Sequence, residues 1–221
     1  SYMLPHPNLR VLGPNIRTFV KAGATGLFAQ GDALCSAGDF VRLRHWVLSH
    51  LLWNPGLDEG RLIDTFLDGY YGEKTGPALK RYLDFIHDRA ERSGVYLGCY
   101  QKNVTQWLDA EGIFEAARLM AAALETARAE EATDPVGRKG LSDKVLRVKL
   151  AIDHVLLIND PLLRQHAVSA GKPFPGAPDF PTAVREWIAA CERFNVKAYC
   201  ETTSEATFTT YKKALLERSQ K

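Results

Sequence analysis

Apolar residues recur at helical spacing from residue 39 almost to the end of the chain, and this pattern constrains the fold more than any other feature. Rows spaced by three and four residues are typical of amphipathic helices. We therefore expect a mainly α structure with about eight or nine helices. After residue 38 the predicted helices cover residues 39–53, 58–71, 75–93, 109–131 and 142–158. A shorter helix is expected to begin at Pro161, and two more are expected around 184–194 and 208–215.

Residues 142–158 carry two apolar rows instead of one. One row is Val145, Val148, Ile152 and Val155, and the other is Leu146, Leu150 and Leu157. A helix that is apolar on two sides needs partners on both of them. This segment is therefore predicted to lie at the centre of the helical region.

The first thirty residues have a different pattern, which predicts a loop, a short helix and a strand. Asn15 can begin a helix that runs through Ala22, and Gly23 can end it. Residues 25–29 form a short apolar run between this helix and the polar sequence Gln30-Gly31-Asp32. Such a run is typical of a buried parallel strand in an α/β protein, so one strand is expected here.

Composition excludes some classes of function. The 28 basic and 26 acidic residues nearly balance, which gives no electrostatic reason to expect a nucleic-acid partner. No run of 18 apolar residues occurs, so no membrane-spanning helix is expected. The four cysteines lack the spacing of a metal site, and no metal or cofactor is predicted. Buried free thiols and a Cys191–Cys200 disulfide remain alternatives.

Two short segments hold the candidate binding residues. Residues 4–9 (LPHPNL) place His6 and Asn8 between prolines, in a loop that should be stiff, and rigid loops with polar tips suit ligand contact. Gln30 and Asp32 follow the predicted strand, where parallel α/β folds hold their ligands. An amide and a carboxylate together can read sugar hydroxyls. The alternatives are that His6 and Asn8 only brace their loop and that Asp32 caps a turn.

Other polar and aromatic side chains have structural interpretations. His87 and His154 lie on predicted helices next to acidic residues, so charged pairs on a solvated face are expected. Trp46 and Trp53 are seven residues apart on one helix, which predicts that both belong to the core.

Four blocks in the first part of the chain resemble a known family. In order they are LPHPNL, PNIRTFVKAGATGLFAQGD, LRHWVLSHLLWNPGLD and FLDGYYG. They resemble a bacterial domain-of-unknown-function family, number 4838, whose glycoside-hydrolase-like members are similar to α-glucuronidases and β-hexosaminidases. The resemblance covers about residues 1–90. It implies a (β/α)8 barrel followed by helices.

By this resemblance the chain begins near the end of a barrel. The LPHPNL block corresponds to the loop after the seventh strand and GLFAQG to the eighth strand. The implied domains are 1–56, the end of a barrel-type catalytic domain, and 57–221, a helical domain. His6, Asn8, Gln30 and Asp32 are then expected to gather at the carboxyl end of the last strand.

The resemblance implies the C-terminal part of a glycoside hydrolase, contributing substrate contacts at the barrel rim and a helical support domain. The acid/base carboxylates of the related hydrolases lie on middle strands, so no catalytic residue is assigned here and activity of the chain alone is not expected. The implied partner is carbohydrate, bound through a longer parent protein that is secreted or periplasmic. Self-association through the barrel-facing surface is a further expectation. The alternative function is a non-enzymatic helical domain that binds glycans or proteins.

Overall fold

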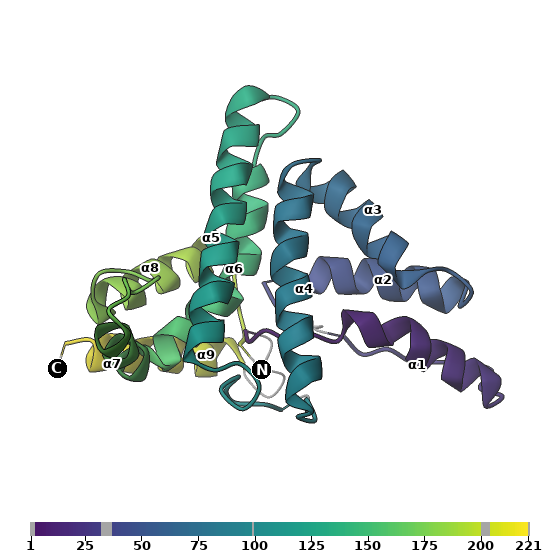
Figure 1. Ribbon diagram of the computed structural model, residues 1–221, viewed down its shortest axis with the longest axis horizontal. Coiled ribbons are helices and arrows are strands. Elements are labelled where there is room, and N and C mark those ends of the chain that lie inside the picture. Colours follow the sequence, from purple (N-terminus) through teal and green to yellow (C-terminus); the bar gives the residue numbers. More distant parts are fainter. Residues whose placement is uncertain (1–2, 32–36, 99, 200–203, 221) are drawn as a thin grey trace.

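The computed structural model describes residues 3–31, 37–98, 100–199 and 204–220. Over these residues the chain forms helices joined by turns and loops (Figure 1). The helices are α1 (Leu9–Lys21), α2 (Val41–Trp53), α3 (Glu59–Tyr71), α4 (Thr75–Ser93), α5 (Ala110–Thr133), α6 (Leu141–Ile158), α7 (Asp160–Ala170), α8 (Phe180–Arg193) and α9 (Glu205–Arg218). The prediction of a mainly α protein with about nine helices is confirmed.

Helix ends follow the local sequence at several positions. The Asp58 and Asp109 carboxylates accept hydrogen bonds from the backbone N–H groups of Arg61 and Gly112, which begins α3 and α5. Gly94 ends α4 with a φ of 64°, a left-handed conformation that favours glycine. These polar and glycine signals explain why the predicted boundaries lie close to the observed ones.

The long helices α4, α5 and α6 pack in series at the middle of the molecule (Figure 1). Helices α1, α2 and α3 lie on the α4 side, and α8 and α9 lie beyond α6. Val145, Val148, Ile152 and Val155 of α6 belong to a large apolar cluster with α2–α5, whereas Leu150 and Leu157 belong to a second cluster with α8 and α9. The two apolar rows therefore face two cores, and the predicted central position of this helix is confirmed.

The first thirty residues differ most from the prediction. Helix α1 begins at Leu9 and contains Pro14, whereas the sequence predicted a start at Asn15. Proline lacks an N–H and removes one hydrogen bond of the helix, but the amphipathic face with Leu9 and Ile16 is buried on both sides of it. Burial of this face thus outweighs the local signal that proline gives.

The predicted strand over residues 25–29 is absent, because residues 24–31 have no regular structure and no strand occurs in the described part of the chain. A strand exists only when a neighbouring chain pairs with its N–H and C=O groups, and no described segment does so here. The end of a barrel is thus not found as an element of this structure. The proposed division at residue 56 stays a prediction, and buried residues on both sides of it share one core.

Candidate functional site

The LPHPNL loop is held in place by polar contacts with α2 and the residues before it. The backbone N–H of His6 donates to the Asp39 carboxylate at 2.9 Å. The Arg44 guanidinium of α2 donates to the His6 carbonyl at 3.0 Å and to the Asn8 side-chain oxygen at 2.9 Å. The side chain of Gln101 donates to the Pro5 carbonyl at 3.0 Å from the opposite end of the loop. The loop is therefore rigid, as its two prolines predict.

A buried ion pair lies beneath this loop. Arg44 and Asp39 are separated by 3.2 Å, and their side chains are only 11% and 3% exposed. Buried charges cost free energy unless each is paired and hydrogen-bonded, and here the loop supplies part of that hydrogen bonding. Asp39 does not cap α2, because Phe40 precedes the helix in a left-handed conformation and Asp39 faces the loop instead.

Helix α4 contributes a buried histidine to the other side of the loop. The Leu9 N–H donates to Nε2 of His87 at 3.1 Å, so this nitrogen must be unprotonated. Nδ1 of His87 then carries the proton and donates to the Leu83 carbonyl at 2.7 Å. Burial lowers the pKa of His87 to about 4, which keeps this neutral form at physiological pH.

The His6 ring differs from that of His87 because its nitrogens make no hydrogen bond within the described part of the chain. Burial and the nearby Arg44 lower the pKa of His6 to about 4, so its ring is neutral. The Asn8 amide nitrogen likewise has no hydrogen-bond partner among the described residues, while its oxygen binds Arg44. Both side chains are half-buried. The loop therefore presents two neutral polar groups from a fixed backbone.

The four predicted binding residues are only partly described. Arg44 brings His6 and Asn8 together. Gln30 is exposed, and the residue after it, Gly31, lies next to the His45 ring of α2. Asp32 lies outside the described residues. The gathering of all four at one place stays a prediction.

Sequence reasoning missed Arg44 and Asp39 as the pair that organises the loop. One signal was present in the sequence, namely an arginine directly after Leu43 in an apolar helix row, five residues from an aspartate. A charge on a buried face requires an opposite charge nearby. The partner loop could not be identified in this way, because it lies more than 30 residues away in sequence.

Three expectations about side-chain burial were wrong. His87 and His154 are each 4% exposed, not on a solvated face. His154 contacts the Met3 carbonyl and the Tyr211 hydroxyl and stacks on Trp187 at 5.0 Å, which satisfies both ring nitrogens inside the second core. Trp53 is 92% exposed because it is the last residue of α2, beyond the face that packs on α3.

An apolar surface is exposed after the LPHPNL loop. Every residue from Arg17 to Gly31 is exposed. This stretch includes Phe19, Val20, Leu27 and Phe28, and Phe28 is 87% exposed. In Figure 1 the carboxyl end of α1 projects away from the other helices. Several large apolar side chains exposed within one short stretch are typical of a surface that a partner covers.

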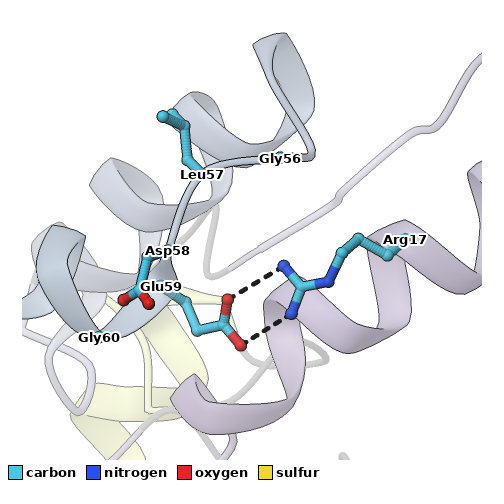
Figure 2. A pocket seen from close by; sticks show the side chains of 6 residues that line it. All are labelled: Arg17, Gly56, Leu57, Asp58, Glu59 and Gly60. Carbon is cyan, nitrogen blue, oxygen red and sulfur yellow. Dashed lines mark hydrogen bonds and ion pairs between the residues drawn. The ribbon is translucent and has the colours of Figure 1, made fainter.

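A separate depression of about 500 Å³ lies between α1 and the loop before α3 (Figure 2). Arg17 reaches across it and forms two hydrogen bonds with the Glu59 carboxylate, at 3.0 and 3.1 Å. These hydrogen bonds hold the pKa of Glu59 below its usual value. The remaining lining comes from residues 56–58 and 60. Arg17 and Glu59 neutralise each other, and the third charged residue, Asp58, accepts a hydrogen bond from the backbone N–H of Arg61 at the start of α3. We therefore assign no catalytic group to this depression.

Comparison with known proteins bears on the first part of the chain. Residues 1–84 match the family described as Domain of unknown function (DUF4838). The match covers the LPHPNL loop, the exposed stretch and α1–α3, and it supports the family resemblance of the sequence blocks. No curated protein and no solved structure matches the chain significantly.

The part of the chain that the structure describes holds neither a membrane-spanning helix nor a metal-binding cluster. None of the helices is long and apolar enough to span a membrane. No group of three or more histidine, cysteine, aspartate or glutamate side chains in these residues is placed to hold a metal ion. Cys191 is buried in the second core, whereas Cys35, Cys99 and Cys200 lie outside the described residues, so the disulfide alternatives stay open.

Proposed function

We propose that this chain is the C-terminal part of a glycoside-hydrolase-like protein. In this proposal residues 24–31 pair with strands of a catalytic barrel, the LPHPNL loop contacts substrate at the barrel rim, and the helices from α3 onward support that domain. The chain by itself cleaves no glycoside, because it lacks an identifiable pair of catalytic carboxylates.

The observation that carries this proposal is the exposed apolar segment within the family-matched residues. Leu27 and Phe28 are 44% and 87% exposed in a stretch whose backbone groups form no strand within the described residues. Neighbouring barrel strands would cover those side chains and satisfy those backbone groups. The adjacent face of α1, with Phe19 and Val20, would be covered by the same domain.

The chemistry of the LPHPNL loop supports carbohydrate as the ligand class. Sugar hydroxyls both donate and accept hydrogen bonds, and they are bound by neutral polar groups on fixed backbones. His6 and Asn8 meet that description, since the first is a neutral imidazole and the second retains a free amide nitrogen within the described structure. Gln30 and Asp32 are proposed to complete the contacts from the end of the paired strand.

The test uses the full protein as its host synthesises it. We expect turnover of at least one member of a panel of aryl glycosides. Phe28→Asp should abolish this turnover by preventing strand pairing, whereas Val136→Asp, at an exposed site on the α5–α6 loop, should leave it unchanged. Asn8→Ala should raise KM with less effect on kcat.

Two results would overturn the proposal. The first is the absence of turnover over the whole panel, which would favour a non-enzymatic domain that binds glycans or proteins. The second is full activity of the Phe28→Asp protein, which would show that residues 24–31 do not belong to the catalytic domain.

A further inference from the structure

Two cations converge on Tyr70, near the carboxyl end of α3. Arg42 of α2 donates to the Tyr70 hydroxyl at 2.5 Å. Lys144 of α6 donates to the Tyr70 carbonyl at 2.9 Å, and its ammonium lies 4.3 Å from the centre of the ring. Phe66 stacks on Tyr70 at 5.0 Å. Three helices therefore fix the positions of the two cations.

These two cations differ from most others in the described structure, because neither forms an ion pair with a described carboxylate. Other basic side chains, such as Arg10, Arg17 and Lys149, are paired with acids. The contacts of Arg42 and Lys144 are a hydroxyl, a carbonyl and an aromatic ring, all of them neutral.

The surroundings add positive charge to this place. Arg138, in the loop before α6, acts on Lys144 together with Arg42, and burial and both arginines lower the pKa of Lys144. Arg138 forms an ion pair with one oxygen of Glu130 at 3.7 Å, while the other oxygen of Glu130 accepts hydrogen bonds from Thr75 at the start of α4. The positive charge of the cluster is thus only partly compensated.

We propose that Arg42 and Lys144, which Tyr70 holds in place, form a binding site for a small oxyanion such as phosphate or sulfate, with Arg138 adding positive charge nearby. Guanidinium and ammonium groups that are already held in place lose little freedom on binding an anion, and charge-assisted hydrogen bonds to oxyanions are strong. The anion would also remove the repulsion among the three cations. This site is independent of the proposed glycosidase function, since it lies on α2, α6 and the α5–α6 loop.

The test measures phosphate binding to the 221-residue chain by isothermal titration calorimetry, at constant ionic strength set with sodium chloride. We expect saturable binding with one site. Arg42→Gln and Lys144→Met should each weaken it at least about tenfold, because each removes a charge-assisted contact. Arg128→Gln is the matched control, since Arg128 is an exposed arginine that pairs with Glu125 on α5, and it should bind phosphate like the wild type.

Titration with phenyl phosphate in place of inorganic phosphate identifies the source of the oxyanion. Tighter binding of the ester would assign the site to a phosphate group on a larger ligand, and equal or weaker binding would assign it to the free anion. The proposal is overturned by the absence of saturable binding, or by equal affinity in the wild type and in folded Arg42→Gln and Lys144→Met variants. Circular dichroism establishes that the variants are folded.

Discussion

At the scale of single residues, the Arg44–Asp39 pair decides how the N-terminal loop is held. Arg44 touches the His6 carbonyl, the Asn8 side chain and the Asp39 carboxylate, and all three contacts are buried or partly buried. His6 and Asn8 lie more than 30 residues from Arg44 in the sequence, whereas Asp39 lies five residues from it. The predicted stiffness of the loop could be read from its prolines, but its anchor could not, because the anchor depends on tertiary contact.

Removing either charge of this pair should destabilise the fold strongly. Asp39→Asn or Arg44→Met takes the opposite charge away from a buried partner, which costs about 3–5 kcal/mol of unfolding free energy. Urea denaturation measures this loss. Arg128→Met, at an exposed pair, should change the stability by less than about 0.5 kcal/mol. Equal losses in the buried and exposed variants would contradict the role given to Arg44.

At the scale of elements, each helix end depends on the groups that satisfy its free backbone atoms. Glu130 of α5 is 8% exposed and accepts hydrogen bonds from the N–H and the hydroxyl of Thr75, the first residue of α4. A side chain 55 positions along the chain thus holds the start of α4, which local sequence signals do not reveal. Where the cap is local, as at Asp58, the sequence predicts the start correctly.

Glu130→Ala should therefore cost about 1–3 kcal/mol, because it leaves buried donors of Thr75 without an acceptor. Glu130→Gln keeps an amide oxygen at the same position and should recover most of that loss. Thermal or urea denaturation measures the stability of both variants and compares each with the wild type. Equal stability of the alanine variant and the wild type would show that another group satisfies Thr75.

A substitution in the exposed stretch after α1, unlike Glu130→Ala, should leave the stability of the chain nearly unchanged. Phe28 packs against neither apolar core of the described structure. Phe28→Asp should therefore change the stability of the isolated chain by less than about 0.5 kcal/mol. The same change should reduce binding of a hydrophobic dye, because it removes part of the exposed apolar surface. Val136→Asp, at a single exposed valine, should leave dye binding unchanged. A large loss of stability with Phe28→Asp would mean that this segment packs on the helices in solution.

At the scale of the whole molecule, buried neutral histidines should make stability depend on pH. Burial lowers the pKa of His87 and of His154 to about 4, against about 6.5 in an unfolded chain. The unfolded state therefore binds more protons between these values, so stability is complete above about pH 6.5 and falls as the pH decreases toward 4.

These two groups together give a slope of up to about 2.7 kcal/mol per pH unit, and His6, whose pKa is also lowered to about 4, adds to it. Urea denaturation at pH 7, 6 and 5 measures this slope. The doubly substituted protein His87→Gln/His154→Gln, if folded, should have a flatter profile than the wild type. A wild-type stability that stays constant from pH 7 to pH 5 would contradict the assigned neutral states.

The helices from α2 onward could be predicted from the sequence, whereas the structure of the first thirty residues could not. The two apolar rows of α6 correctly predicted its place between two cores, because periodicity reports how many faces a helix buries. Residues 25–29 have the apolar pattern of a strand, but strand formation depends on a neighbour that no local pattern can supply. His6 and Asn8 were predicted from their loop, whereas Arg44, which positions both, was missed.

We propose that residues 24–31, which are exposed in the described structure, pair with barrel strands in a longer parent protein. Hydrogen exchange of the backbone amides of this segment, followed by mass spectrometry, tests it most directly. We expect fast exchange of these amides in the 221-residue chain and strong protection of them in the protein as its host synthesises it. Equally fast exchange in both would contradict the account.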